Sequence, residues 1–277
     1  PLRRLSQELN QIEVQNLSEA LEVPATNDEI SRLTISFNKM LARLDEAFTA
    51  QKQFSANAAH ELRTPLAVIQ TNLEVFARRE APALKDYQEI FAMLQEQTGR
   101  LSHLAEILLD MTGVQTVERS ERISLAALTD EVFCDLASVA EQKDVELIQQ
   151  EGDCIITGSY LLLYRAVYNL VENAIKYNHS GGKVTVNIHL SEEITDTSTS
   201  VNYVFLEVSD TGIGIPPEYQ EKIFTPFFRV DKSRSRAMGG AGLGLALVSE
   251  IVRQHNGQVK VLESSKKGSI IAIILPV

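Results

Sequence analysis

Cysteine, long apolar runs and basic residues are all scarce in this 277-residue chain, and each shortage excludes a class of protein. There are only two cysteines, Cys134 and Cys154, and no CxxC pair. We therefore expect two buried, reduced side chains and no disulfide framework or thiolate metal site. No apolar run is long enough to cross a bilayer. Acidic residues outnumber basic ones by 37 to 26, which argues against nucleic acid as the main partner.

The chain also lacks a signal peptide and starts at Pro1, so we expect a fragment of a longer protein. Its length allows two or three domains. The chain divides into three regions that differ in composition and in the pattern of apolar residues: 1–46, 47–115 and 120–277.

Amphipathic helices dominate the first two regions. DEISRLTISFNKMLARL (28–44) repeats apolar residues at steps of three or four, with Asn27 or Asp28 as a plausible N-cap. Residues 47–115 hold two longer helical patterns around the charged, proline-containing turn RREAPALKD (78–86). This arrangement predicts an antiparallel helical hairpin, which buries its apolar seam by pairing with a second copy in a four-helix bundle.

Residues 120–277 mix strand-like and helical runs with glycine-rich breaks, which predicts a compact α+β domain. The predicted helices are 125–142, 161–177 and 245–255. The predicted strands are 183–190, 203–210, 258–264 and 269–277. The polar run SEEITDTSTSVN (191–202) is predicted to be the loop of a hairpin.

One histidine has unusual neighbours. His60 lies in AAHELRTPL (58–66) and, at about 100° per residue, points away from the apolar seam. Glu61 can accept a proton from the imidazole, and Thr64 lies one turn later on nearly the same face. Pro65 removes the usual hydrogen bond to the Glu61 carbonyl. These residues alone leave two readings open: a reactive nucleophile at an adjustable point of the helix, or a surface histidine beside a tolerated kink.

A polar helix face follows in YNLVENAIKYNHSGG (168–182). Asn169, Asn173, Lys176 and Tyr177 fall at positions i, i+4, i+7 and i+8, on one face. Asparagine amides commonly bridge parts of a structure. Their oxygens also suit Mg²⁺, which completes its shell with phosphate and water, and a nearby lysine would complement the phosphates.

Two glycine-rich segments complete the pattern. In EVSDTGIGIP (207–216) a strand ends at Asp210, whose carboxylate can accept a hydrogen bond from an exocyclic amine such as that of adenine. Gly212 and Gly214 then let the backbone approach a ligand. In GGAGLGLAL, Gly240, Gly242 and Gly244 precede an apolar helix whose N-terminus can receive phosphate. Between these segments, Arg229, Lys232, Arg234 and Arg236 read as a lid over an anion. Each signal is weak alone, but together and in this order they are strong.

In this order the segments resemble the boxes of a two-component sensor histidine kinase. AAHELRTPL resembles the H-box, NLVENAIKY the N-box, DTGIGIP the G1 box, IFTPFF the F-box and GAGLGLAL the G2 box. The lid VDKSRSRAMGG resembles that of the WalK and VicK kinases. The resemblance implies a HAMP signal-relay domain (1–46), a dimerisation and histidine-phosphotransfer domain (47–115) and a catalytic ATP-binding domain (120–277). The last would be an α+β sandwich of the GHKL, or Bergerat, type.

The resemblance also implies residue roles. His60 would accept the γ-phosphoryl group of ATP with Glu61 as general base, and Thr64 would help to position water for dephosphorylation. Asn173 would hold Mg²⁺. The implied nucleotide-binding residues are Asn169, Asn173, Lys176, Tyr177, Asp210, Gly212, Gly214, Arg229, Gly240, Gly242 and Gly244.

The implied protein is a homodimer that phosphorylates an aspartate of a response regulator and also acts as its phosphatase. It would work on the cytoplasmic side of a bacterial membrane, and a transmembrane helix would precede Pro1. Two alternatives stay open: a different GHKL-type ATPase, and a non-catalytic coiled-coil adaptor with a nucleotide-binding domain.

Overall fold

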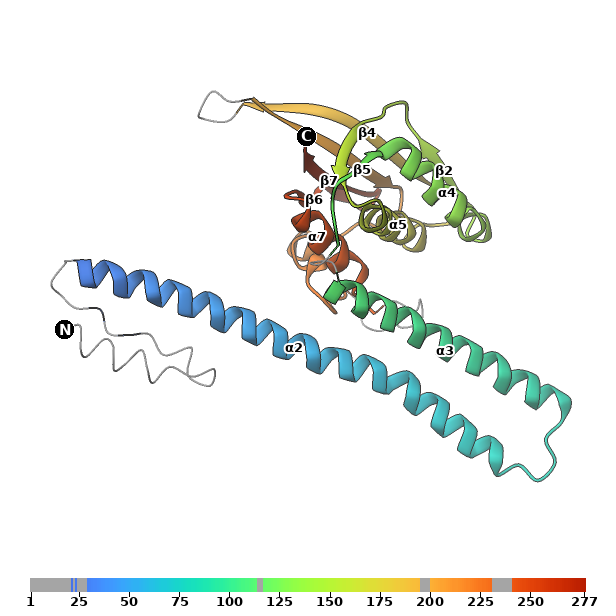
Figure 1. The fold of residues 1–277 in the computed structure, drawn as a ribbon. Helices are drawn as coiled ribbons and strands as arrows, with labels where there is room; N and C mark the ends of the chain where they lie inside the picture. Colours follow the sequence, from blue (N-terminus) through green and yellow to red (C-terminus); the bar gives the residue numbers. More distant parts are fainter. Residues whose placement is uncertain (1–20, 22, 24–28, 114–116, 195–199, 231–240) are drawn as a thin grey trace. The chain divides into compact units, whose positions relative to one another are not determined.

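The computed structural model of this chain describes all residues except 1–20, 22, 24–28, 114–116, 195–199 and 231–240 (Figure 1). The predicted N-cap at Asn27 or Asp28 and the basic lid residues Lys232, Arg234 and Arg236 therefore lie outside the described residues. The chain divides into two compact units, residues 1–64 and 65–277.

Helix α2 (Glu29–Ala77) fills most of the described part of the first unit and continues into the second. It runs through Pro65 without interruption. In the first unit, Leu41 is buried and forms a small cluster with Leu21, against which Ile30 and Phe37 pack. The Asn38 side chain accepts a hydrogen bond from the Leu21 N–H and donates one to the Leu21 carbonyl, both at 2.9 Å. Asn38 thus ties Leu21 to the apolar stripe predicted for 28–44.

The predicted helical hairpin is confirmed in the second unit. The end of α2 is followed by a short turn and by α3 (Leu84–Gly113). Asp86 caps this turn: it accepts a hydrogen bond from the Ala83 N–H at 2.8 Å and pairs with Arg79. The two contacts, Ala83 first and Arg79 second, hold the pKa of Asp86 below its usual value. The Phe76 and Tyr87 rings meet edge to face at 5.0 Å and close the hairpin.

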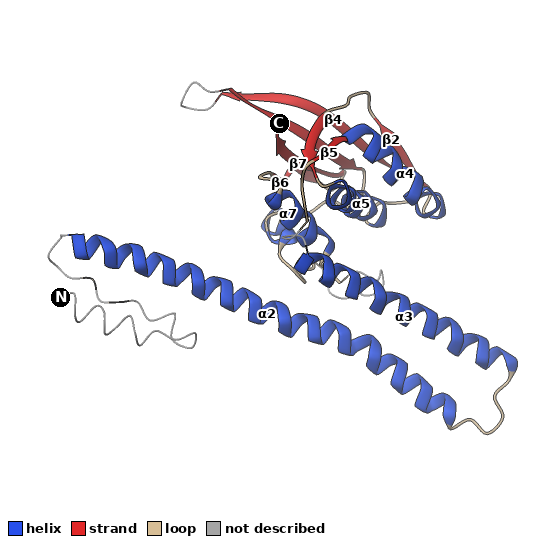
Figure 2. Ribbon diagram, viewed as in Figure 1, coloured by secondary structure: helices blue, strands red, loops and turns tan. Residues whose placement is uncertain are grey.

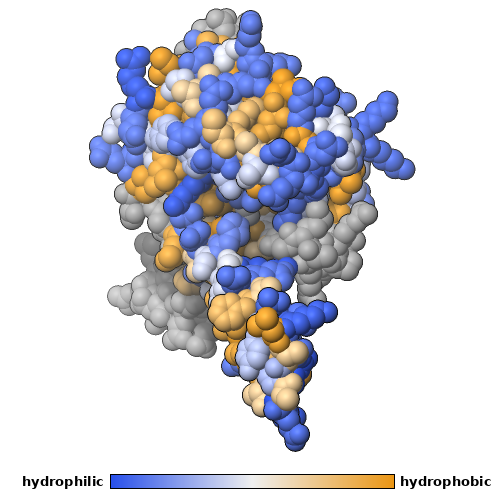
Figure 3. All heavy atoms as spheres, turned by 90° about the vertical axis from the view of Figure 1, so that its right-hand side faces the viewer, coloured by the Kyte–Doolittle hydropathy of each residue, from blue (hydrophilic) through white to orange (hydrophobic). Residues whose placement is uncertain are grey.

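The apolar seam of this hairpin is open to solvent in the single chain. Figure 3 faces the α2–α3 turn and shows apolar side chains at its surface. Exposed large apolar side chains of the hairpin are Leu66, Val68, Leu73, Val75, Leu84, Tyr87, Phe91 and Leu109. So many exposed apolar residues on two helices are typical of a surface that is buried against another molecule.

A five-stranded sheet forms the base of the C-terminal domain, in the order β2-β4-β5-β7-β6. Its strands are β2 (Val145–Gln149), β4 (Gly182–Ile194), β5 (Ser200–Asp210), β6 (Gln258–Ser265) and β7 (Gly268–Pro276). Only the β2–β4 pair is parallel. A second, two-stranded sheet pairs β1 (Glu121–Ser124) with β3 (Ile155–Gly158). The predicted α+β domain is confirmed.

The hairpin predicted around the polar run 191–202 is present, but the prediction of a loop was wrong at both ends of the run. Residues 191–194 belong to β4 and 200–202 to β5, whose antiparallel pairing continues from Ile188↔Leu206 out to Ile194↔Ser200, and residues 195–199 lie outside the described part of the chain. Backbone groups carry this pairing, so polar side chains do not prevent it. Strands β1, β2 and β3 were not predicted at all.

Three helices cover one face of the large sheet: α4 (Leu125–Gln142), α5 (Tyr160–Lys176) and α7 (Gly244–Gln254) (Figure 2). Their bounds agree with the predicted ranges to within one residue. Ser124 and Ser159 cap α4 and α5 by accepting hydrogen bonds from the N–H groups of Ala127 and Leu162. Two single 3-10 turns, η2 (Pro217–Tyr219) and η3 (Lys222–Phe224), lead from β5 toward α7. Fully buried side chains between helices and sheet include Val132, Leu136, Leu163, Leu206, Leu247 and Ile273.

The cysteines divide between the core and the surface. Cys154 is buried, as predicted, whereas Cys134 is exposed. The prediction for Cys134 was wrong because this residue falls on the solvent side of the amphipathic helix α4, two positions after the buried Val132. None of the helices in the described part of the chain is both long and apolar enough to span a membrane.

A buried histidine joins α7 to the start of α5. The backbone N–H of Ser159 donates to Nε2 of His255 at 3.1 Å, and Nδ1 lies 2.8 Å from the Ile251 carbonyl oxygen. A neutral ring with its proton on Nδ1 satisfies both contacts. Burial lowers the pKa of His255.

We expect the stability of the protein to fall as the pH drops below about 6.5. Below that value His255 binds a proton in the unfolded chain but not in the folded one, and this favours unfolding. The contribution of His255 to the free energy of unfolding is therefore complete above the unfolded pKa, and it is lost as the pH falls toward the lower pKa of the folded state. Thermal unfolding at about pH 7.5 and 5.5 measures the difference. His255→Gln should show a smaller difference between the two pH values than the parent. Equal differences would contradict this role for His255.

Candidate functional site

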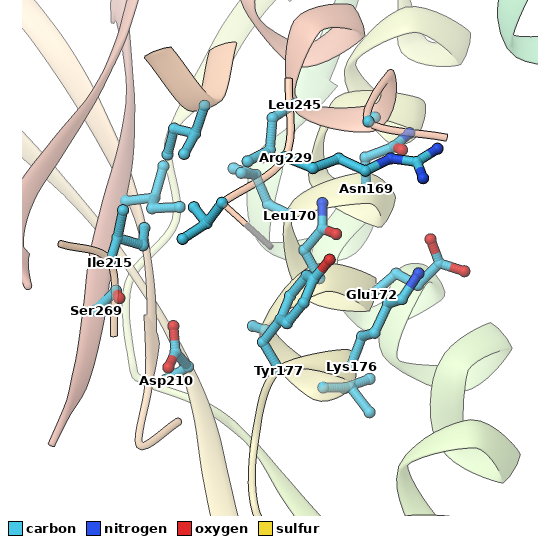
Figure 4. A pocket seen from close by; sticks show the side chains of 18 of the residues that line it. Asn169, Leu170, Glu172, Lys176, Tyr177, Asp210, Ile215, Arg229, Leu245 and Ser269 are labelled. Atoms are coloured by element: carbon cyan, nitrogen blue, oxygen red, sulfur yellow. The ribbon is translucent and has the colours of Figure 1, made fainter. Parts of the chain in front are cut away.

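A cavity of about 880 Å³ lies in the second unit, and residues of the predicted N, G1, F and G2 boxes line it (Figure 4). The predicted residues in its wall are Asn169, Asn173, Lys176, Tyr177, Asp210, Gly214, Arg229, Gly242 and Gly244. Gly212 lies beside Asp210, and Gly240 is outside the described residues. Figure 4 shows Asn169, Glu172 and Lys176 along α5, with Asp210 and Ser269 on the strand side. Segments more than 70 residues apart in the chain thus meet at one cavity.

The polar face of α5 exists because the opposite face is buried in the core. Leu170, Val171 and Ile175 pack inward, which turns Asn169 and Asn173 toward the cavity. The Asn169 amide donates to the Arg165 carbonyl at 2.8 Å, so its oxygen faces the start of α7. A Cβ at Gly244 would lie 2.5 Å from that oxygen, so only glycine lets α7 begin this close to α5.

Asp210 stands at the end of β5, on the strand side of the cavity. The Gly212 N–H donates to Asp210 Oδ1 at 2.7 Å. A Cβ at Gly212 would lie 2.4 Å from the Tyr177 carbonyl oxygen, so glycine is required for this turn. Burial raises the pKa of Asp210, although hydrogen bonds from the Gly212 and Ser269 backbones oppose the rise. The carboxylate is therefore poorly hydrated and suited to a hydrogen-bond donor on a ligand.

Basic side chains gather at the other side of the cavity. Burial lowers the pKa of Lys176; Glu172 opposes the shift, and the nearby charges of Arg229, Lys143 and Arg100 add to it. Lys143 lines the same cavity and hydrogen-bonds to the Lys176 carbonyl. Several cations around one partly buried lysine repel one another, and a bound anion relieves that repulsion. This side of the cavity suits phosphate groups.

A hydrogen-bond network that was not predicted holds the turn after Asp210. The Thr211 hydroxyl donates to Asn178 Oδ1 at 3.1 Å, and the Asn178 amide donates to the Lys183 carbonyl at 3.0 Å. The Ile213 N–H donates to the Tyr177 carbonyl at 3.2 Å. The end of α5 and the DTGIGIP turn therefore form one rigid unit. The only signal in the sequence was that Asn178 and Thr211 adjoin the two predicted boxes.

The donor set around the cavity fits a cation bound through phosphates better than a protein-only metal site. No group of three or more His, Cys, Asp and Glu side chains in the described regions could hold a metal ion. Among these residues, none hydrogen-bonds to the Asn173 side chain, whose amide oxygen is thus available. Mg²⁺ is commonly bound by one or two protein ligands together with phosphates and water.

His60 belongs to the first unit, where its side chain is exposed on α2. The Thr64 hydroxyl donates to the His60 carbonyl at 3.1 Å, so it lies one turn further along the helix. Glu61 is half-buried beside His60. The imidazole is thus open to a second molecule or domain.

Three family descriptions match the chain in succession. Residues 1–46 match the HAMP domain. Residues 50–116 match the His Kinase A (phospho-acceptor) domain. Residues 158–277 match the histidine kinase-, DNA gyrase B- and HSP90-like ATPase family.

Curated relatives match the chain over most of its length. It is 31% identical to the sensor histidine kinase CusS of Escherichia coli strain K12, over 100% of this chain and 56% of that protein. It is 31% identical to the signal transduction histidine-protein kinase ArlS of Staphylococcus aureus, over 99% of this chain and 59% of that protein. The chain thus spans little more than half the length of these relatives.

Solved structures share the fold. The ThkA histidine kinase, in complex with the response regulator TrrA, aligns with a TM-score of 0.62 at 22% identity, over 90% of this chain and 68% of that one. The Acinetobacter baumannii histidine kinase AdeS aligns with a TM-score of 0.58 at 24% identity, over 78% of this chain and 97% of that one.

Proposed function

We propose, from the premise that this chain belongs to the sensor histidine kinases, that it transfers the γ-phosphoryl group of ATP to His60 and then to an aspartate of a response regulator. One observation supports this most: the polar face of α5, Asp210 and the glycine turns line a single cavity in a chain that also exposes His60 in a phospho-acceptor segment.

Each part of the cavity has a role in this proposal. Asp210 accepts a hydrogen bond from the exocyclic amine of adenine, while Tyr177 contacts the nucleotide. Lys176, Arg229 and the glycines of the GAGLG segment bind the phosphates, as the local excess of cations favours. Asn173 would hold Mg²⁺, with Asn169 beside it, and the ion would supply charge neutralisation at the phosphates.

The transfer to histidine needs one nucleophile and one base. A ring nitrogen of His60 attacks the γ-phosphorus, a nitrogen–phosphorus bond forms, and the bond from phosphorus to the ADP oxygen breaks. Glu61 accepts the proton of the other ring nitrogen as positive charge develops on the imidazole. Positioning of the two reactants supplies most of the rate enhancement. The phosphoryl group then moves to the aspartate of the regulator and frees His60.

The same proposal includes the assembly and its location. The exposed seam of the α2–α3 hairpin, with Leu66, Leu73 and Phe91, supports a homodimer that buries it in a four-helix bundle. The ThkA chain was solved with a response regulator, and we propose a partner of that kind here. The HAMP match supports a location at a bacterial membrane, with this region on the cytoplasmic side.

A labelling experiment tests the proposal. The purified chain is incubated with Mg²⁺ and γ-labelled ATP, and the product is treated with acid and with base. Acid-labile, base-stable label on the chain is expected, and its passage to a receiver domain follows. Nucleotide binding without any label would favour the adaptor alternative, and ATP hydrolysis without label would favour a different GHKL-type ATPase.

Thr64→Ala should reduce phosphatase activity toward the regulator roughly tenfold or more and leave autophosphorylation near the parental rate. The hydroxyl of Thr64 lies one turn beyond His60, where it can position a water molecule. Release of phosphate from a phosphorylated receiver domain measures the effect.

Ser55→Ala provides a matched control for Thr64→Ala. The Ser55 hydroxyl bonds to the Gln51 carbonyl at 3.0 Å, also four residues back in α2. Nine residues correspond to about 180° around the helix, so Ser55 lies on the face opposite Thr64. If both variants lose phosphatase activity equally, the effect comes from the helix and not from the Thr64 hydroxyl.

A further inference from the structure

Helix α3 contributes to the wall of the nucleotide cavity, although it lies outside the segment that matches the ATPase family. His103 and Ile107 both line the cavity, and Ile107 is only 6% exposed. The charge of Arg100 also contributes, as the last of several causes after burial, to lowering the pKa of Lys176. Arg100, His103 and Ile107 lie at steps of three and four residues, so they share one face of α3.

The same face of α3 continues to Asp110, which pairs with Arg165 of α5. Arg165 also holds the Asn169 amide through its carbonyl. The ion pair therefore joins the C-terminal part of α3 to α5, one turn before Asn169.

Several positively charged side chains influence one another at this junction. Arg100 pairs with Glu96 at 2.6 Å along its own helix, yet its charge still disfavours the protonated form of Lys176. Lys143 and Arg229 act in the same sense. These three cations come from three different segments, and among the described residues Glu172 opposes their effect on Lys176. A polyphosphate bound among them would be attracted from α3 as well as from the ATPase fold.

We propose that Arg100 and His103 bind the nucleotide by contacting its phosphates from α3. ATP or ADP then binds to two domains at once, and its binding holds the C-terminal domain against the α3 face that ends at Asp110. This inference rests on the proposed nucleotide site. It adds that the affinity for phosphates depends on α3.

Calorimetric titration of the full chain with ADP and with adenosine tests the proposal, because adenosine lacks the phosphates. Arg100→Gln should weaken ADP binding roughly three- to fivefold, as expected for one partly exposed ion pair. The double variant R100Q/H103A should weaken it about tenfold, since the histidine ring N–H is a second donor. Adenosine binding should stay at the parental value in both. The loss for ADP should disappear in about 1 M salt, where such charges are screened.

Lys85→Gln is the matched control. Lys85 pairs with Glu89, four residues on in α3, so this variant also removes one positive charge and one ion pair, but far along the helix from the cavity residues. It should bind ADP like the parent. Parental ADP affinity in R100Q, or an equal loss for adenosine, overturns the role of α3 and leaves the nucleotide site intact. Failure of the parent to bind ADP overturns the proposed function and this inference together.

Discussion

His60→Gln should abolish phosphorylation of the chain, with the acid-labile label falling at least about 100-fold to background, while ADP affinity stays parental. Glutamine keeps a polar side chain on the exposed face of α2 but has no nucleophilic ring nitrogen. Nucleotide binding should persist because the residues that line the cavity belong to the second unit and His60 belongs to the first. Labelling with γ-labelled ATP, followed by calorimetric titration with ADP, measures the two properties separately.

His189→Gln is the control for this experiment. His189 is half-buried on β4, where its ring stacks on Phe205 at 5.2 Å, and it does not line the cavity. This variant should label like the parent, which would show that loss of a histidine as such is harmless. Label that persists in His60→Gln and keeps its acid lability would place the acceptor on another histidine and refute the assignment of His60.

Elements with a strong amphipathic period could be predicted from the sequence almost to the residue. Helix α4 has the bounds predicted for it, and α5 and α7 differ by one residue, because each buries a continuous apolar stripe and begins beside a clear break. Ser159, the cap of α5, is one such break. The polar face of α5 could be predicted for the same reason, since a helix that buries one face must expose the other.

Features set by distant contacts could not be predicted. Strand β2 is five residues long, and its pairing with β4 depends on a segment more than 30 residues away. The polar ends of β4 and β5 look like a loop, yet backbone pairing extends them. His103, Lys143 and Ser269 join the cavity from three other elements, and nothing in their local sequence indicates this.

The boundary between the predicted first and second domains has no mark in the backbone. Helix α2 runs unbroken from Glu29 to Ala77, across the predicted boundary at residue 46 and through Pro65. A change in the pattern of apolar residues predicts a boundary between two packing surfaces. It does not require the helix that carries both surfaces to end there. The domain bounds and the residue roles therefore stay predictions, and the variants of His60, Thr64 and Arg100 test the roles one by one.

Asp210→Asn should lower the affinity for ADP about 100-fold, or about 2.7 kcal/mol, and at the same time raise the melting temperature of the free protein. The loss follows because a neutral amide is a weaker acceptor for the exocyclic amine of adenine than a buried carboxylate. The gain follows because burial raises the pKa of Asp210. Its charged form thus costs stability at every pH above the folded pKa, and the cost declines only as the pH falls from that value toward the unfolded one.

The two effects of Asp210→Asn together distinguish a binding residue from a structural one. The Asn oxygen can still accept the Gly212 N–H, so the turn at DTGIG should keep its shape. Thermal unfolding at neutral pH, with and without ADP, measures both properties. Without ADP the parent should melt at a lower temperature than the variant, and ADP should raise the melting temperature of the parent. The variant should melt at a higher temperature without ADP, and ADP should raise its melting temperature only slightly. A variant that melts lower and binds ADP normally would show that Asp210 holds the fold together and does not recognise the nucleotide.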